Sequence, residues 1–305
     1  MRTMSRAGGS ISTTGTGSSS KWSAMAVEPL SPAQLAAYLA RIGLSAPVAA
    51  DLATLDAIVR AHVQAIPFEN IDVQLGRGLT TDPDAAFAKL VEGRRGGWCY
   101  EHNGVLGAAL AAIGFDVMRM SAGVMRQLRG DESIGSHLCL LVQCDGPKLV
   151  DAGFGSWLGA PVPLEQGQWL HDPLPVSLGR TDDAMWRVSV SLGTAAMSYD
   201  FVAQPADEDQ LSALCHWQAT DPASVFVQNL TVQRRLAGNY LMLRGKVLTV
   251  VGAHGEERRE LGSAGELVST LRELFLIDVP EAADLWPAIE ARHERLFGPQ
   301  AAPTT

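Results

Sequence analysis

The chain has 305 residues, of which 47% are hydrophobic and 19% charged, a balance typical of a globular protein with a large core. Its formal net charge of −9 argues against nucleic-acid partners, because these require a basic face to meet the phosphates. No apolar run approaches the roughly 18 residues needed to span a membrane, so we expect no membrane association.

Four cysteines are spread along the chain, and none forms a CxxC pair. This sparse usage indicates a reducing compartment, so we predict a cytoplasmic protein with neither a disulfide framework nor a metal site. Residues 1–27 are rich in small polar residues and lack the apolar segment of a secretory signal. We expect them to form a disordered extension.

Residues 28–115 are predicted to form a helical bundle. Ser31 followed by Pro32 is a typical start of a helix, and Leu35 and Leu39 recur at helical spacing after it. The second predicted helix stops before Pro67, which disfavours helical backbone in the residue ahead of it. Helices are predicted over 30–44, 48–66, 82–93 and 103–115.

The pattern changes at residue 116, and residues 116–210 carry short apolar runs typical of strands. Their spacing indicates a small antiparallel barrel or sandwich. Within 137–154 a Cys-Asp-Gly-Pro turn separates two such runs and predicts a hairpin. Residues 211–305 mix strands with helices, expected at 265–277 and 283–297. Helices, then strands, then a mixture of both predict an α+β fold.

The sequence RRGGWCYEHNG, residues 94–104, raises the question of whether Cys99 is a packed thiol or a nucleophile. A thiol just before a helix lies at the positive end of the helix dipole, which favours the thiolate. Backbone N–H groups at that point can form an oxyanion site. Glu101 and His102 are interpreted as bystanders. The remaining cysteines are expected to be inert core thiols, namely Cys139, Cys144 and Cys215.

A catalytic thiol also needs a base and a group that orients the base. His137 opens the apolar run HLCLLVQ after a polar, glycine-containing loop, and Asp151 ends the run KLV. The predicted hairpin brings these two residues close together. An acid between Val150 and Ala152 would be costly to bury without hydrogen bonds. The residues alone leave open a structural histidine and an aspartate that merely caps a turn.

Three segments, RGGWCYEHN, SHLCLLV and LVDAGFG, in this order and spacing resemble the signature segments of the arylamine N-acetyltransferase family. The segments IPFENIDV at 66–73 and ATDPASVF at 219–226 resemble further family segments. The resemblance implies an N-terminal helical bundle, a central antiparallel β-barrel, a C-terminal α/β lid and a cysteine-proteinase-like core. It makes Cys99 the nucleophile that becomes S-acetylated, His137 the base and Asp151 its partner.

The same resemblance implies a ping-pong reaction in which acetyl-CoA acylates Cys99 and an arylamine or arylhydrazine then attacks the thioester. It implies acetyl-CoA as a substrate rather than a resident cofactor, no metal, and a monomer or homodimer. Three alternatives stay open: an amide synthase of the same fold that releases a polyketide chain by intramolecular amide formation, a cysteine hydrolase, and a non-catalytic binding protein.

Other positions acquire roles only through the resemblance. Glu69 is expected to pair with Arg95 and so to clamp the Arg-Gly-Gly turn at 95–97 ahead of Cys99, which we call the nucleophile turn. Asn103 is expected to order the triad. The acceptor pocket is expected to be lined by Phe68, Val124, Phe154 and Phe201. The CoA cleft is expected near Ser224, Phe226 and Trp217. Four arginines are candidates for the CoA phosphates, with a solvated face as the alternative: Arg126, Arg129, Arg234 and Arg235.

Overall fold

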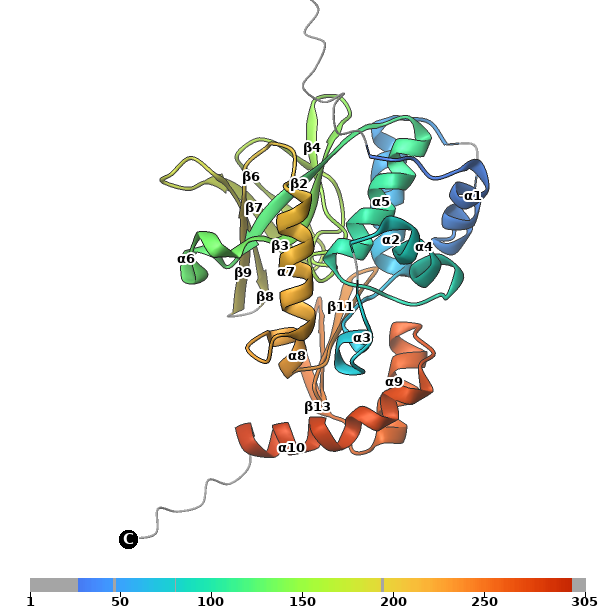
Figure 1. The fold of residues 1–305 in the computed structure, drawn as a ribbon, viewed down its shortest axis with the longest axis vertical. Coiled ribbons are helices and arrows are strands. Elements are labelled where there is room, and N and C mark those ends of the chain that lie inside the picture. The colour runs from blue at the N-terminus through green and yellow to red at the C-terminus, as the bar shows by residue number, and fades with distance from the viewer. Residues whose placement is uncertain (1–26, 46–47, 80, 193–194, 298–305) are drawn as a thin grey trace, which may run out of the picture.

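The computed structural model describes residues 27–45, 48–79, 81–192 and 195–297 (Figure 1). The disordered extension predicted over 1–27 lies outside this part of the chain except for its last residue. Helices make up the first third of the described chain. They are α1 Pro32–Arg41, α2 Leu52–Ala65, α3 Ile71–Gln74, α4 Pro83–Phe87, the π-helical turn η1 Ala88–Glu92 and α5 Cys99–Ile113.

The first of these helices follow their sequence signals closely. Ser31 caps α1 by accepting the backbone N–H of Gln34, and the Gln34 side chain accepts the N–H of Ser31 in return. Asp51 caps α2 through the N–H of Thr54 at 2.8 Å. The segment predicted as one helix over 82–93 is α4 continued by η1.

The helix α5 begins at Cys99 rather than near residue 103, which corrects the predicted start. The Glu101 carboxylate accepts the backbone N–H of Trp98 at 3.1 Å and so closes the first turn. Every residue from Cys99 to Leu110 is buried, because the other helices cover one side of α5 and strands cover the other (Figure 1). The catalytic candidate therefore lies within the helix, in its first turn.

Eight antiparallel strands form a barrel-like sheet in the order β5-β4-β3-β2-β9-β8-β7-β6. The first of these strands begins at Asp116, where the sequence pattern changes, and ends at Val124, and the short helix α6 Arg126–Arg129 follows it. A 3-10 turn, η2 Asp131–Ser133, leads into the next strand. The strands are β2 Asp116–Val124, β3 Ile134–Gln143, β4 Pro147–Val150, β5 Val162–Pro163, β6 Gly167–His171, β7 Leu174–Arg180, β8 Trp186–Leu192 and β9 Ala195–Phe201.

A second, five-stranded antiparallel sheet lies toward the C-terminal end, and its edge strand comes from the N-terminal part of the chain. Phe68 and Glu69 of that edge strand pair with Gln233 and Val232. The sheet consists of β1 Phe68–Glu69, β10 Thr231–Leu236, β11 Asn239–Arg244, β12 Val247–Gly252 and β13 Gly255–Glu260. The helices of this part of the chain are α7 Glu208–Thr220, which packs on β3 of the barrel-like sheet, α8 Val225–Gln228, α9 Ala264–Phe275, the 3-10 turn η3 Pro280–Leu285 and α10 Trp286–Phe297.

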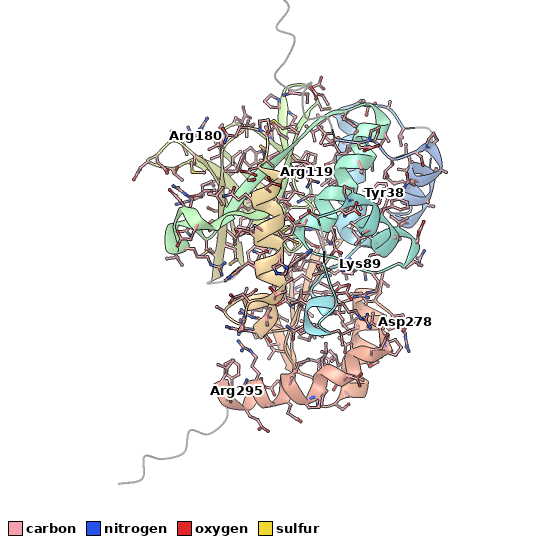
Figure 2. All side chains as sticks on the ribbon, in the orientation of Figure 1. Tyr38, Lys89, Arg119, Arg180, Asp278 and Arg295 are labelled. Atoms are coloured by element: carbon pink, nitrogen blue, oxygen red, sulfur yellow. The ribbon has the colours of Figure 1, made fainter. Side chains whose placement is uncertain are left out.

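The strand β3 is buried on both faces, which explains its unbroken apolar run. Leu140 and Val142 pack into the core of the helices, whereas Cys139 and Leu141 pack into the interior of the barrel-like sheet. Side chains fill the space between these layers, with Lys89 near the centre and Arg180 and Arg295 at the periphery (Figure 2). The strand that carries His137 is thus fixed between two cores.

Candidate active site

The nucleophile turn lies against β1 at very short range. The backbone of Glu69 donates to the carbonyl of Gly97 at 2.8 Å, and Gly97 donates to the carbonyl of Pro67 at 3.2 Å. A Cβ atom on Gly96 would come within 2.3 Å of the Pro67 oxygen, so this position requires glycine. The glycines of the RGG sequence therefore hold the start of α5 tightly against β1.

The second half of the site comes from the predicted hairpin of β3 and β4. The His137 Nε2–H donates to Asp151 Oδ2 at 2.8 Å, and both side chains are almost fully buried. Gly153 follows in close contact with the nucleophile, because a Cβ there would lie 2.5 Å from the Cα of Cys99. The structure thus brings Cys99, His137 and Asp151 together, as the sequence predicts.

Asp151 is stabilised as a carboxylate. Burial alone would raise the pKa of Asp151, but the positive charge and hydrogen bond of His137, followed by the hydrogen bonds of Asn103 and Gly153, lower it below the ordinary value. Its Oδ1 accepts from the Asn103 side chain at 2.8 Å and from the N–H of Phe154 at 3.1 Å. The acid therefore carries the charge that an orienting partner needs.

His137 is correspondingly stabilised as an imidazolium. Burial would lower the pKa of His137, but the charge and hydrogen bond of Asp151, together with the hydrogen bond and charge of Cys99, raise it to about 10. Since Nε2 is committed to Asp151, Nδ1 is the ring nitrogen that remains for the Cys99 sulfur. A proton-carrying imidazolium next to a thiol is the arrangement of a cysteine nucleophile with its base.

Asn103 connects the three segments that carry Cys99, His137 and Asp151. Its Nδ2 donates to the carbonyl of Leu138 at 2.6 Å and to Asp151, and its Oδ1 accepts the N–H of Ala152 at 2.9 Å. It is fully buried on α5, one helical turn after Cys99. One amide side chain therefore links α5, β3 and the loop after β4.

Beside Cys99 and His137 lies a cavity of about 400 Å³. Of the residues expected in the acceptor pocket, Phe68, Val124 and Phe154 line this cavity. Phe201 does not: it is fully buried, and its ring lies 6.0 Å beyond that of Tyr199. Met197, on the same strand β9, does line the cavity.

The three residues expected near a CoA cleft lie in different surroundings. Phe226 lines the cavity and packs edge-on against Trp98, with ring centroids 5.7 Å apart. Ser224 is buried and caps α8, accepting the N–H of Phe226 and donating to the carbonyl of Gln218 at 2.7 Å. Trp217 is 40% exposed on α7 and is not among the described residues that line the cavity.

An ion-pair network underlies the nucleophile turn. The expected pair of Arg95 with Glu69 is present, with 2.7 Å between nitrogen and oxygen, and Arg95 also lies 3.2 Å from Asp72. Lys89 joins Asp72 at 2.8 Å to Glu101 at 3.0 Å. Burial would lower the pKa of Lys89, but the surrounding carboxylates raise it. Glu101 is thus part of the support of α5 and not a bystander.

His102 is also structural, which corrects its interpretation as a bystander. Its Nε2–H donates to the carbonyl of Pro67, so its Nδ1 accepts from His62 Nε2 at 2.8 Å. His62 Nδ1 in turn accepts from the hydroxyl of Tyr38 at 2.8 Å. A buried chain of hydrogen bonds therefore runs from α1 through α2 and α5 to the backbone beneath the nucleophile turn.

Of the four arginines considered for phosphate contacts, Arg129 lines the cavity. Arg235 fits neither expectation, because it is 3% exposed and donates to backbone carbonyls such as that of Ser156. Arg234 donates to the carbonyls of Gln64 and Leu274. Arg126 pairs with carboxylates, namely Asp131, Asp183 and Asp200.

Several residues that line the cavity are not predicted from the sequence. Gln218 on α7 and Arg244 at the end of β11 both line the cavity, as do Trp157 and Met197. The alternation of β11 places Arg244 on the face of Tyr240 and Met242, but nothing in the sequence shows that β11 ends at this cavity. For Gln218 we find no signal in the sequence that would have singled it out.

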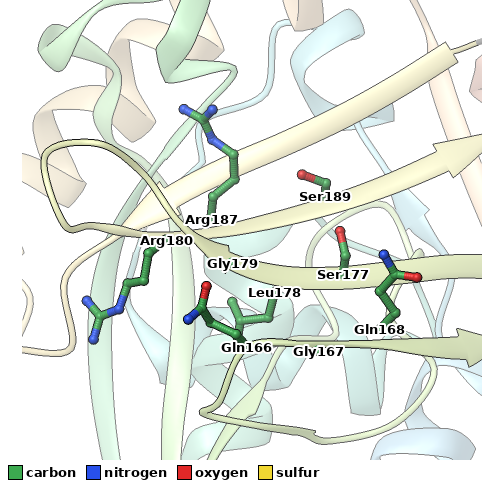
Figure 3. A pocket seen from close by; sticks show the side chains of 9 residues that line it. All are labelled: Gln166, Gly167, Gln168, Ser177, Leu178, Gly179, Arg180, Arg187 and Ser189. Atoms are coloured by element: carbon green, nitrogen blue, oxygen red, sulfur yellow. The ribbon is translucent and has the colours of Figure 1, made fainter.

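A second hollow, of about 410 Å³, lies on β6, β7 and β8 and is lined mainly by polar residues, including Gln166, Ser177 and Ser189 (Figure 3). Its Arg187 is paired with Asp200 at 2.6 Å, and no cysteine or histidine lines it among the described residues. In the described part of the chain, no cluster of metal-ligating side chains occurs, and no helix has the length and apolarity to cross a membrane.

Comparison with known proteins gives one consistent family. A family model described as N-acetyltransferase matches residues 51–284. The chain is similar to the arylamine N-acetyltransferase of Mycolicibacterium smegmatis, with 38% identity over 82% of this chain and 94% of the relative. It is also similar to that of Escherichia coli, with 31% identity over 80% of this chain and 89% of the relative.

Solved structures agree with this relationship. The Mycobacterium tuberculosis arylamine N-acetyltransferase matches with a TM-score of 0.76 and 33% identity, over 84% of this chain and 99% of that one. The Mycobacterium marinum enzyme in complex with CoA matches with a TM-score of 0.75 and 32% identity, over 86% and 98%. The cysteine-proteinase-like core, the signature segments and these matches lead to one conclusion: the chain belongs to the arylamine N-acetyltransferase family.

Proposed function

We propose that the protein transfers an acetyl group from acetyl-CoA to arylamines and arylhydrazines through an S-acetyl intermediate on Cys99. The observation that carries this proposal is the hydrogen-bonded pair of His137 and Asp151, at 2.8 Å, beside the thiol of Cys99 at the wall of the 400 Å³ cavity. The cavity gives a donor and an acceptor access to the same sulfur.

In the first half-reaction, the Cys99 sulfur attacks the acetyl carbonyl carbon of acetyl-CoA. Backbone N–H groups in the first turn of α5, that of Cys99 foremost, are suited to stabilise the negative oxygen of the tetrahedral intermediate. When the C–S bond to CoA breaks, the CoA thiolate takes the proton held on His137. Cys99 then carries a thioester and His137 is neutral.

In the second half-reaction, the amine nitrogen attacks the thioester. An aromatic amine is uncharged at neutral pH, so its lone pair is available without a strong base. His137 takes a proton from the nitrogen as the new C–N bond forms, and the Cys99 thiolate leaves. This restores the imidazolium beside the thiolate.

The lining of the cavity supports this choice of substrates. Phe68, Val124 and Phe154 give apolar walls for an aromatic ring. Arg129 and Arg244 line the cavity, and no described Asp or Glu does, which favours an anionic donor such as acetyl-CoA. Phe226 contacts the same space, and Ser224 positions it by capping α8. Trp217 is proposed to contact CoA from the exposed side of α7.

The four cysteines are free thiols, which suits work in the cytoplasm. We propose a division into a helical bundle over 28–115, a barrel over 116–210 and an α/β lid over 211–305, and a monomer or homodimer that needs no resident cofactor or metal.

Initial-rate kinetics test the reaction. With acetyl-CoA and a small arylamine varied together, a ping-pong reaction gives parallel double-reciprocal lines, and intersecting lines would contradict it. Continued CoA release beyond one equivalent per enzyme in the absence of an amine would indicate a hydrolase. Absence of transfer to any small arylamine or arylhydrazine would favour the amide synthase alternative.

A further inference from the structure

The side chain of Gln218 reaches from α7 into the site. It is 4% exposed and lines the cavity together with Cys99 and His137. Its Nε2 donates to the carbonyl oxygen of Ser136 at 2.9 Å. Its Oε1 accepts from the hydroxyl of Tyr100 at 3.3 Å. Both partners are neighbours of the triad in sequence, since Ser136 precedes His137 and Tyr100 follows Cys99.

The Ser136 carbonyl is an electrostatic neighbour of the nucleophile. The Cys99 sulfur lies 4.0 Å from this oxygen, which is therefore an acceptor for the thiol proton that competes with His137. The partial negative charge of a carbonyl also opposes negative charge on a nearby sulfur. A hydrogen bond donated by Gln218 to the same oxygen reduces both effects, because it occupies a lone pair and offsets the charge.

The contact between the Gln218 amide oxygen and the Tyr100 hydroxyl helps to fix the distance between Cys99 and His137. The single proton of the Tyr100 hydroxyl lies between two acceptors, the carbonyl of Gly135 at 2.8 Å and the Gln218 Oε1 at 3.3 Å, and the nearer Gly135 is the main acceptor. The first turn of α5, the start of β3 and the last turn of α7 are therefore joined around one amide. The backbone carbonyl of Gln218 accepts the hydroxyl of Ser224, which caps α8 ahead of Phe226.

We propose that Gln218 is a positioning residue for acyl transfer, whose amide keeps the Ser136 carbonyl from holding the thiol proton of Cys99 and so favours the thiolate beside the His137 imidazolium. This inference rests on the proposed function of Cys99 as nucleophile. It assigns to α7 a direct effect on the triad, in addition to the contact of this part of the chain with the cavity.

The test uses the pH dependence of Cys99 alkylation by iodoacetamide, followed on the Cys99 peptide by mass spectrometry in the full-length protein without acetyl-CoA. Gln218→Glu has nearly the same shape, loses the donor and adds negative charge, so the midpoint of alkylation should rise by about one pH unit or more. Gln218→Met loses the donor without adding charge and should shift the midpoint in the same direction by less. Gln210→Glu adds the same charge on an exposed position of α7 and should leave the midpoint unchanged.

Acetyl transfer is measured on the same proteins. At pH 7 Gln218→Glu should lose up to about tenfold in kcat for each pH unit of midpoint shift, Gln218→Met should lose less, and both should recover part of this loss at higher pH. An alkylation midpoint equal to that of the wild type in a folded Gln218→Met protein would overturn the inference. If the midpoint shifts but the wild type acetylates no amine, the role of Gln218 in Cys99 ionisation stands and the proposed function fails.

Discussion

Asp151 shows at the scale of a single residue how a buried charge is made stable. Hydrogen bonds reach its two oxygens from the His137 ring, the Asn103 amide and the backbone N–H groups of Gly153 and Phe154. Because every donor is fixed by a helix, a strand or the tight turn at Gly153, Asp151 is oriented before any substrate binds. The negative charge of Asp151 holds His137 in its protonated form.

Replacing this charge alone tests its role. In Asp151→Asn the side chain keeps its shape but loses its charge, so His137 is no longer held as an imidazolium. We expect kcat/KM for acetyl transfer to fall by about 10³–10⁴, the size seen when the acid of a comparable triad is neutralised. Asp145→Asn, in the exposed hairpin turn, is the matched control and should retain full activity. A loss of less than tenfold in Asp151→Asn would contradict the role.

The pH dependence of the first half-reaction reports on His137. Its pKa is raised to about 10, so the imidazolium persists through neutrality and deprotonates only above that value. The rate of Cys99 acetylation should therefore hold on the alkaline side of neutrality and decline as the pH rises through about 10, because the departing CoA thiolate then lacks its proton. Stopped-flow release of CoA measures this, and a decline already near pH 7 would be inconsistent with it.

At the scale of elements, α5 owes its position to the groups buried beneath its first turn. The chain from Tyr38 through His62 and His102 to the Pro67 carbonyl requires neutral imidazoles. Burial lowers the pKa of His62 well below its usual value, and the pKa of His102 to about 4. Folding thus opposes protonation of both rings.

The hydrogen bonds that link Tyr38, His62 and His102 should make the stability of the protein depend on pH below neutrality. Because the unfolded chain binds the His102 proton near pH 6.5 and the folded protein only near 4, stability falls as the pH drops between these values, by up to about 3 kcal/mol for this residue. His102→Gln removes the imidazole that makes these hydrogen bonds, so at pH 8 the variant should be less stable than the wild type. It also removes the His102 titration. The difference should narrow toward pH 4.5 in urea unfolding. A difference in unfolding free energy between the two proteins that does not change with pH would contradict a neutral His102 in the folded protein.

At the scale of the whole molecule, three parts of the chain meet at Glu69. Its strand β1 pairs with β10 of the C-terminal sheet, and its carboxylate accepts from Arg95 of the nucleophile turn and from the backbone N–H of Ile71. The Glu69 side chain is fully buried, and that of Arg95 is 14% exposed. The ion pair therefore connects the C-terminal sheet with the start of α5.

Removing the Glu69 charge leaves the largely buried Arg95 with Asp72 alone as its carboxylate partner. Glu69→Gln should lower the free energy of unfolding by about 3–5 kcal/mol, measured by urea denaturation. As the control, Asp278→Asn breaks an exposed pair with Arg272 near the surface (Figure 2) and should cost less than about 1 kcal/mol. Equal effects of the two substitutions would argue against a supporting role of Glu69.

The sequence predicts that Cys99, His137 and Asp151 lie close together because these residues occur in short, ordered segments. The hairpin turn between β3 and β4 fixes His137 near Asp151, and the glycines beside Cys99 and at Gly153 are required by close contacts. Other features depend on distant parts of the chain. The start of α5 was missed because its cap comes from Glu101 and not from a residue ahead of the helix.

The sequence does not mark β5, β6 and β7 as separate strands, since short strands such as β6 carry exposed polar residues and show no clear apolar run. Phe201 shares a face of β9 with Met197, but position along a strand, which decides the distance from a cavity, is not encoded by alternation. The role proposed for Gln218 depends on how α7 packs on β3. No local pattern predicts such packing.

The proposed reaction requires that Cys99 carry the acetyl group between donor and acceptor. The direct measurement is mass spectrometry of the intact protein after exposure to acetyl-CoA alone, followed by addition of an arylamine. We predict one acetyl group on the Cys99 peptide, absent in Cys99→Ser, formed far more slowly in His137→Ala, and removed when the amine is added. Failure to detect any acyl group on Cys99 with acetyl-, propionyl- or malonyl-CoA would contradict the account.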